Sequence, residues 1–575
     1  MTWQGFAQFF IFFGLVLTLA PLGGLYLDRV YNRQKTPLDF LLEPVERFIY
    51  RLCHIDAEGE QHWSSYALSL VALSLTGIAV VVIFLLLQKF LPLNPDKLPG
   101  LGFFQALDTA IAAVTNTGWH YYIPEKTLSH FSRMAIISVQ CFLSGAMAMS
   151  VAVALVRGLA RTEGRTIGNF WVDITRSLLW ILLPLCLIAA TVLIITGVPQ
   201  NFSGAINTAP IENISQKIAE GPVASQVAIK LAASSGMGVF AASSAHPYEN
   251  PGAFSNFFEL LLMLFLPAAF INFFGRQVGD KTKGMALLVV MGALFITMVF
   301  TAYWAENQRN PLIEHMSMDQ LPSNENIGGN LEGKEVRFGT AGSVLWGVTA
   351  TATANASVNA AHDSMMPLTG LVLLTDLLLN ETVFGAAGSG LYKILVFVII
   401  TAFVANLLTG KVPEYLGKKI EPRETGWLVL ALAVGPAMTL GFSSFAMLAP
   451  GILRSISNPG PHGLSQVVYD YGSAAANNGS AFAGFDTATI WNSLAMSISM
   501  LVSRYLVMIC ILGLAGSLVV KKRVAISGKS FSTNSTTFVI TLLLMLIICT
   551  ALAYLPVLVM GPITEHLLII GKRSL

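Results

Sequence analysis

Long apolar segments separated by polar loops recur along the whole chain. A helix that crosses a membrane needs about 20 predominantly apolar residues, and ten segments of the sequence meet this requirement. They lie at about 4–27, 64–91, 127–157, 168–197, 253–278, 282–304, 367–409, 425–450, 486–519 and 535–557. The pattern therefore predicts an all-α polytopic membrane protein with ten transmembrane helices.

The seventh apolar segment, 367–409, is too long for a single crossing. It contains the run GAAGSG, which brings Gly385, Gly388 and Gly390 close to its middle. A helix can be broken inside a membrane only where protein or water satisfies the freed backbone groups. We predict a broken helix here, whose glycines form either a gate of an inner passage or a kink that serves packing.

Composition supports the membrane assignment and excludes other classes. Hydrophobic residues make up 54% of the 575 residues and charged residues 11%, whereas soluble proteins carry about 25% charged residues. A net charge of +2 is too small for a nucleic-acid-binding protein, which must neutralise phosphates. The five cysteines are scattered, which predicts free thiols rather than a disulfide framework.

Basic residues predict the orientation in the membrane. Lys and Arg are concentrated in the loops that follow odd-numbered spans, whereas the other loops hold fewer, Lys230 and Lys334 among them. Because cytoplasmic loops carry the excess of Lys and Arg, we expect both termini to lie outside. The longest hydrophilic stretch, about 305–345, is too short to bind and hydrolyse a nucleotide.

Each outside loop that follows an even-numbered span contains a moderately apolar, helix-sized segment ending in small and polar residues. We call these endings the four signatures: AVTNTG (113–118), ASSGMG (233–238), TATANA (351–356) and AANNG (475–479). We predict four helix–pore loop–helix repeats at 64–157, 168–278, 282–409 and 425–519, plus one extra helix at each end (4–27 and 535–557). Internal repeats with interrupted segments point to a transport pathway at their shared axis.

The chemistry of the signatures favours potassium as the transported ion. None contains Asp, Glu, Lys or Arg, and a ring of carbonyl oxygens can replace the hydration shell of K⁺. We expect Gly118, Gly236, Gly238 and Gly479 to adopt positive φ angles that aim carbonyls at one axis. The candidate ion-binding residues are Thr115, Asn116, Thr117, Gly118, Ser234, Ser235, Gly236, Met237, Gly238, Thr353, Ala354, Asn355, Ala356, Asn477, Asn478 and Gly479.

Two further residues are candidates for roles near this pathway. Arg504 lies near the middle of the ninth span, where a charge is costly unless it faces a partner or water. It is either one half of a structural salt bridge or an electrostatic barrier below the signatures. His120 adjoins the first signature and could make ion uptake pH-sensitive.

Short motifs in every repeat resemble one known family. They are LPLNPDKLPG (91–100), VTNTGWHYY (114–122), GPVASQ (221–226), SAHPYENP (244–251), LEGKEVRFG (331–339), AHDS (361–364), GSGLYK (388–393), PEYLGKKIEPRE (413–424), NPGPHG (458–463) and NNGSAFAG (477–484). With these motifs the chain closely resembles the potassium-binding subunits (KdpA) of bacterial Kdp potassium-transporting ATPases.

The resemblance implies a division of labour in a bacterial inner membrane. Such a subunit binds external K⁺ and passes it to a P-type ATPase partner (KdpB), which hydrolyses ATP, while two small subunits (KdpC and KdpF) complete the complex. The chain departs from the family pattern at Met237 and Ala356, where glycine is usual, and at His120, where some members carry Gln. We expect Met237 and Ala356 to restrict the backbone and to alter the selectivity.

Three alternatives remain open from the sequence. The chain could be a stand-alone K⁺ channel or symporter of the same superfamily. It could be a membrane-embedded enzyme that uses His362 and Asp363, although adjacent helical residues point in different directions. A structural scaffold is the third alternative, but it would leave four charge-free polar loops unexplained.

Overall fold

A computed structural model describes residues 1–209, 216–316, 318–323, 328–449, 451, 453–523, 533 and 535–571. Ten helices in this part of the chain are long and apolar enough to cross a membrane, which confirms the predicted number. They are α1 (Trp3–Tyr31), α3 (Trp63–Leu86), Ser132–Ala160 with α6 (Val139–Ala160), Phe170–Ile195 with α7 (Phe170–Arg176) and α8 (Leu183–Ile195), α10 (Ala253–Gln277), α11 (Lys281–Glu306), α14 (Ser389–Leu408), α15 (Pro422–Leu448), α17 (Ile490–Val519), and Thr536–Ile570 with α18 (Thr536–Leu558) and α19 (Thr564–Ile570).

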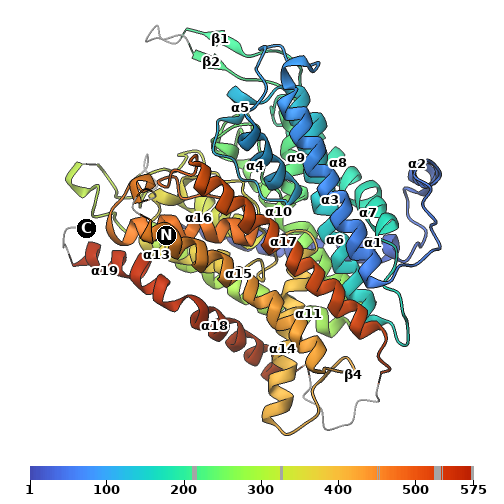
Figure 1. Cartoon of the computed structure of the whole chain (residues 1–575). Helices are drawn as coiled ribbons and strands as arrows, with labels where there is room; N and C mark the ends of the chain where they lie inside the picture. The colour runs from blue at the N-terminus through green and yellow to red at the C-terminus, as the bar shows by residue number, and fades with distance from the viewer. Residues whose placement is uncertain are drawn as a thin grey trace.

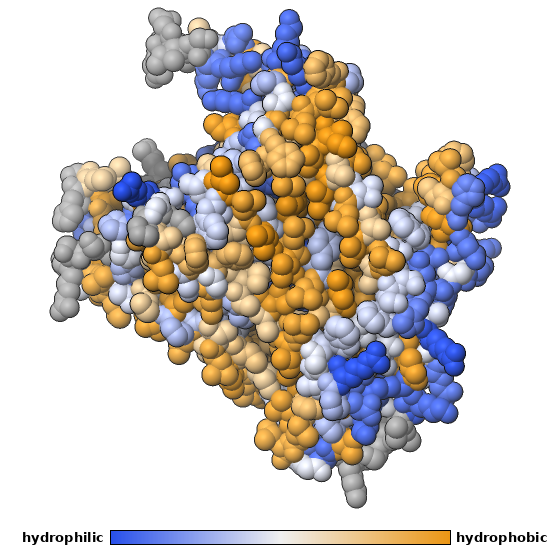
Figure 2. All heavy atoms as spheres, in the orientation of Figure 1, coloured by the Kyte–Doolittle hydropathy of each residue, from blue (hydrophilic) through white to orange (hydrophobic). Residues whose placement is uncertain are grey.

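The outer surface is divided into polar ends and an apolar belt. Figure 1 shows both chain termini on the side of the bundle opposite to β4 (Lys418–Lys419), which pairs with β3 (Glu414–Tyr415). Polar residues gather near β1 (Ile206–Thr208) and β2 (Gln216–Ile218) at one end, and near α2 (Asp39–Leu52) and the β4 loop at the other, with a mostly apolar surface between them (Figure 2). Such a belt matches the hydrocarbon layer of a membrane.

Four short helices in the connections between spans end inside the molecule. They are α4 (Phe103–Val114), α9 (Val223–Ala232), α12 (Gly339–Ala352) and α16 (Gly460–Ala476). All residues in the last two turns of α9, α12 and α16 are buried, apart from Ile229 of α9. Each helix leads directly into one of the four signatures, as the sequence predicts.

Small residues allow the long helices to approach closely. Gly24 on α1 faces α10, and a Cβ atom added to it would lie 2.6 Å from the Cβ of Asn272. Close packing of backbones at small residues is the usual means by which transmembrane helices associate, because lipid is as apolar as their side chains. The first helix is thereby attached to the span that ends the second predicted repeat.

The predicted break in the seventh segment is confirmed. α13 (Pro367–Leu378) and α14 are separate helices, and residues 379–388 join them without regular helical structure. Gly385 and Gly388 have φ angles of 65° and 91°, which glycine adopts readily. A Cβ atom on Gly390 would lie 1.4 Å from the carbonyl oxygen of Phe384, so the connection requires glycine there as well.

Candidate functional site

The four signatures share one backbone feature. The residue one or two positions after each short helix has a left-handed conformation, although none of the four is glycine. The φ angles are 61° at Asn116, 54° at Ser234, 50° at Ala354 and 56° at Asn477. Non-glycine residues rarely adopt this conformation because it crowds the Cβ atom. Its occurrence at the same place in all four signatures shows that they have a common turn geometry.

Side-chain amides join the signatures into a closed ring. Asn116 donates from Nδ2 to the carbonyls of Ala233 and Ser234, both at 3.0 Å. Asn355 donates to the carbonyl of Lys230 at 3.1 Å, Asn478 donates to the carbonyl of Ala350 at 2.9 Å, and Asn477 donates to Thr117 Oγ1 at 3.1 Å. These bonds connect the first signature to the second, the third signature to α9 before the second, and the fourth signature to the first and to α12 before the third.

The Oδ1 atoms of three of these asparagines are engaged in hydrogen bonds as well. Asn116 Oδ1 accepts a hydrogen bond from Ser144 at 2.7 Å. Asn355 Oδ1 and Asn478 Oδ1 accept bonds from the backbone amides two residues further on, at 3.0 and 2.9 Å. Since both the nitrogen and the oxygen of all three amides are engaged, these side chains hold the ring together.

Glycine is required wherever the signatures touch. A Cβ atom on Gly118 would lie 2.5 Å from the carbonyl oxygen of Ser235, and one on Gly236 would lie 2.1 Å from the amide nitrogen of Ala356. One on Gly479 would lie 2.5 Å from the amide nitrogen of Gly118. Such separations exclude any side chain.

The expected positive φ angles occur at only two of the four glycines. They are found at Gly236 (71°) and Gly479 (97°) but not at Gly118 and Gly238. Gly118 is instead required by the contact between signatures. At Gly238 the absence of a side chain leaves room for the carboxylate of Glu249, because a Cβ atom there would lie 2.7 Å from Glu249 Oε1.

Two carbonyls at the end of the second signature accept hydrogen bonds from a side chain. Gln226 on α9 donates from Nε2 to the carbonyls of Met237 and Gly238, both at 3.1 Å. The Met237 side chain is buried in an apolar cluster that includes Trp119 and Tyr471. Because the Ser234 carbonyl accepts a bond from Asn116, the better candidates for ion contact in this signature are the carbonyls of Ser235 and Gly236 and the hydroxyls of Ser234 and Ser235.

Hydroxyl groups are distributed unevenly around the ring. Thr115 Oγ1 and Thr353 Oγ1 bond to carbonyls of their own helices at 2.8 and 2.7 Å. The Oγ atoms of Ser234 and Ser235 are buried and, within the described residues, have no hydrogen-bond partner. No group of three or more His, Cys, Asp or Glu residues in the described part of the chain could hold a metal ion, so a site at the signatures would rely on backbone and hydroxyl oxygens.

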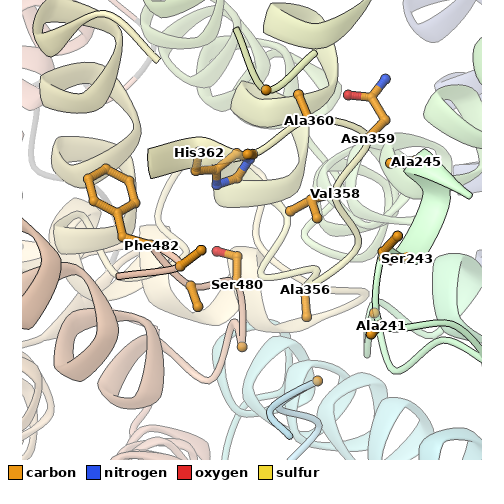
Figure 3. A pocket seen from close by; sticks show the side chains of 18 of the residues that line it. Ala241, Ser243, Ala245, Ala356, Val358, Asn359, Ala360, His362, Ser480 and Phe482 are labelled. Carbon is orange, nitrogen blue, oxygen red and sulfur yellow. The ribbon is translucent and has the colours of Figure 1, made fainter. Parts of the chain in front are cut away.

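A cavity of about 600 Å³ opens onto the signatures, and its lining includes Gly118, Gly236, Ala356 and Gly479. Figure 3 shows Ala356, Ser480 and His362 around this space. Asp470, which is fully buried, adds a carboxylate to the lining, and its Oδ2 has no partner within the described residues. We call this space, which touches all four signatures, the entrance cavity.

His120 lies at this entrance and contacts the first signature. Its Nδ1 lies 3.2 Å from the carbonyl oxygen of Gly118. Burial lowers the pKa of His120 below its usual value, because desolvation disfavours the charged imidazolium. A neutral ring next to the signature adds no positive charge to the path of a cation.

His362 and Asp363 do not form a catalytic pair. His362 Nδ1 lies 2.9 Å from the hydroxyl of Tyr469, whereas Asp363 pairs with His462 at 2.9 Å and accepts a bond from Gln466 at 2.9 Å. The two side chains serve different partners. The geometry gives no support to the enzymatic alternative.

Arg504 and the broken helix both reach the ring from neighbouring elements. Arg504 is buried and donates to the carbonyl of Ser144 at 3.2 Å. The hydroxyl of Ser144 in turn donates to Asn116 Oδ1 in the first signature. None of the ion pairs among the described residues includes Arg504, which disfavours the structural salt bridge. The amide of Gly385 donates to the carbonyl of Ala352 at 2.9 Å, so the break packs against the end of α12.

Comparison with known proteins decides the family. The family described as potassium-transporting ATPase A subunit (KdpA) matches residues 10–567. The chain belongs to this family. A potassium-transporting ATPase potassium-binding subunit of Rhodospirillum centenum is 44% identical over 567 residues, covering 99% of this chain and 98% of that protein. The corresponding subunit of Pseudomonas aeruginosa is 44% identical over 556 residues, covering 97% of each chain.

A solved structure supports the fold independently of sequence. The potassium transporter TrkH of Vibrio parahaemolyticus superposes with a TM-score of 0.51 at 14% sequence identity. The superposition covers 86% of this chain and 95% of that one. The KdpA-family chain thus shares the helical architecture of a membrane transporter.

Proposed function

We propose that this chain is the subunit of an ATP-driven potassium uptake complex that selects K⁺ and passes it on. The observation that carries the proposal is the closed ring of four charge-free signatures next to the entrance cavity. Backbone carbonyls, with the hydroxyls of Ser234 and Ser235, would replace the hydration shell of K⁺ as the transported substrate. The names of the relatives, potassium-binding subunits of potassium-transporting ATPases, support the choice of ion.

The ion-binding residues in this proposal are those of the four signatures, 115–118, 234–238, 353–356 and 477–479. One signature lies in each of the four predicted repeats, 64–157, 168–278, 282–409 and 425–519. The first helix (4–27) and the last (535–557) stand outside them. Below the ring, the positive charge of Arg504 would repel a passing cation, and the connection that includes Gly385 would gate the inner passage. Both features lie within one or two hydrogen bonds of a signature.

We also propose the setting of the complex. A P-type ATPase partner (KdpB) hydrolyses ATP, so this chain does not, and KdpC and KdpF complete the assembly. The chain lies in the bacterial inner membrane, surrounded by lipid, with both termini outside. The excess of basic residues in the loops that follow odd-numbered spans supports this orientation.

The experiment that tests the proposal is ATP hydrolysis by the purified complex across the alkali-metal series. K⁺ should stimulate hydrolysis at much lower concentration than Na⁺, because the carbonyl ring matches a large, weakly hydrated cation. Stimulation that does not depend on K⁺ would contradict the proposal. K⁺ uptake that persists in membranes lacking the ATPase partner would favour a stand-alone channel or symporter.

A further inference from the structure

A lysine is completely buried immediately behind the second signature. Lys230 lies on α9, four residues before Ser234, and its side chain has 0% exposure. A buried ammonium is costly unless it is paired and hydrogen-bonded. Placed beside a cation pathway it would also repel the ion. A buried lysine that is costly to desolvate and that would repel the transported ion needs a structural or functional explanation.

The side chain of Lys230 holds the backbone that follows the second signature. Its Nζ forms an ion pair with Glu249, which also has 0% exposure, and donates to Ser243 and Ser244 at 3.2 and 2.9 Å. Glu249 Oε1 in turn accepts hydrogen bonds from the amides of Val239 and Phe240 at 2.8 and 2.9 Å. The ion pair therefore fixes the exit of the signature to the helix that precedes it.

The backbone of the same lysine holds the signature itself. Its carbonyl accepts hydrogen bonds from the amides of Ser235 and Gly236, both at 3.0 Å. It also accepts the bond from Asn355 Nδ2 at 3.1 Å. One residue thus contacts the second signature, the segment after it, and the third signature.

A serine chain extends this network to the third signature by a second route. Ser244 bonds to Ser357 at 2.9 Å, and Ser243 bonds to Ser357 at 3.3 Å. Figure 3 shows Ser243 near the segment that carries Ala356 and Val358. The amide of Ser357 donates to Asn355 Oδ1 at 3.0 Å. Two independent connections therefore run from Lys230 to the third signature.

A second carboxyl group lies at the edge of this network. Ser244 donates to Glu259 Oε2 at 3.0 Å, and Glu259 is fully buried on α10. Glu249 alone balances the positive charge of Lys230, so the ion pair presents no net positive charge to the ring. A lysine at this place therefore need not repel a cation in the ring.

We propose that Lys230 and Glu249 are positioning residues that set the spacing of the second and third signatures and thereby determine which cation the ring accepts. The inference rests on the filter function proposed above. A ring of carbonyls discriminates between ions through the number and arrangement of its oxygens, and flexibility in two of its four parts would weaken that discrimination. Among the described residues, the other ion pair with 0% exposure on both side chains is Lys334 with Glu306, and it has no comparable hydrogen bonds to a signature there.

The test uses the assembled ATPase complex carrying Lys230→Met, Glu249→Gln or both substitutions. We expect the half-saturating K⁺ concentration to rise about tenfold, equivalent to about 1.4 kcal/mol of binding free energy. Hydrolysis stimulated by Na⁺ should rise relative to hydrolysis stimulated by K⁺. The maximal rate of ATP hydrolysis at saturating K⁺ should change by no more than about twofold. Both side chains are fully buried within this chain, so they contact neither ATP nor the ATPase subunit.

Lys521→Met serves as the matched control. Lys521 pairs with the buried Glu424 at 2.7 Å near the start of α15, far along the chain from every signature. Its loss should lower thermal stability without changing the half-saturating K⁺ concentration. The double variant distinguishes a loss of folding from a loss of positioning. Removing both charges avoids the unpaired buried charge of the single variants and so recovers stability, but it does not recover the hydrogen bonds that hold the signature.

Three outcomes decide the matter. An unchanged half-saturating K⁺ concentration in the double variant, or a shift equal to that of Lys521→Met, would overturn the positioning role. A raised concentration with increased Na⁺ stimulation would support it. If the unmodified complex shows no dependence on K⁺, or Gly479→Asp has no effect, the filter function itself fails, and this result is distinct from failure of the Lys230 inference.

Discussion

At the scale of single residues, glycine and asparagine have separate tasks in the ring. Glycines allow the signatures to touch, as Gly236 does with a would-be Cβ position 2.1 Å from Ala356. Asparagines of the first, third and fourth signatures tie them to neighbouring segments through their side-chain amides, as Asn478 does with Ala350 at the end of α12. In the first and fourth signatures the two residue types lie within two positions of each other, so both the close contact and the hydrogen-bonded attachment come from the same short segment.

Gly479→Ser should weaken K⁺ binding strongly. The new Cβ atom would lie 2.5 Å from the Gly118 amide nitrogen, and the φ of 97° is unfavourable for serine. Backbone strain of this kind costs of order 1–3 kcal/mol, and the first and fourth signatures would separate. The half-saturating K⁺ concentration for ATP hydrolysis measures the effect. Gly292→Ser is the control, because nothing lies within 4 Å of its Cβ position; equal behaviour of the two variants would contradict the prediction.

Met237→Gly tests the departure from the family pattern. The sequence alone predicts sharper K⁺ preference, but the structure places this side chain in a buried apolar cluster and its carbonyl on Gln226. We therefore expect a loss of about 2–4 kcal/mol of stability from the cavity that is left, with a smaller effect on the ratio of Na⁺ to K⁺ stimulation. Thermal unfolding of the complex measures the loss of stability. A Met237→Gly variant as stable as the unmodified chain would contradict a packing role for this side chain.

At the scale of elements, the ten spans and the broken helix could be predicted because each depends on local apolar length and on glycine content. The depth of single side chains could not be predicted in the same way. The basic-residue pattern assigns Lys230 and Lys334 to loops outside the membrane but says nothing of their depth, and the structure buries both against carboxylates. Their partners lie 19 and 28 residues away in the sequence, and only tertiary packing brings them together. The left-handed residues of the signatures could not be predicted from glycine content, because all four carry a side chain.

Gly390→Ala should disturb the connection between α13 and α14. The added methyl group would lie 1.4 Å from the Phe384 carbonyl oxygen, so residues 379–388 must move. Because this connection bonds to the end of α12 through Gly385, we expect a lower maximal transport rate with a smaller change in half-saturating K⁺ concentration. Gly441→Ala, which has free space around its Cβ position, is the control. A normal maximal rate would argue against a gate at this place.

At the scale of the whole molecule, polar contacts attach the last helix to the parts around the ring. His462, at the start of α16, pairs with Asp363 and with Glu565 on α19, both at 2.9 Å. Asp363 follows the third signature and α16 precedes the fourth. The three side chains therefore connect two predicted repeats with the C-terminal helix, at the same end of the molecule as the entrance cavity.

This cluster makes stability depend on pH in a defined direction. Burial disfavours the charged imidazole, but hydrogen bonds to Asp363 and Glu565 outweigh it and raise the pKa of His462 from 6.5 to about 10. A raised pKa in the folded state adds stability that is fully present below the unfolded value and is lost as pH rises through the folded value. The contribution should therefore persist at neutral pH and disappear near pH 10.

His462→Gln should lower the stability of the complex at pH 7 by about 2 kcal/mol, the loss expected for hydrogen bonds between charged groups. The difference from the unmodified chain should shrink as pH rises towards 10, because the unmodified histidine then loses its proton as well. Thermal unfolding at several pH values measures both effects. His54→Gln, at an exposed position without an ion pair among the described residues, should show neither. A difference that stays constant from pH 7 to pH 10 would mean that the charge of His462 does not hold the last helix in place.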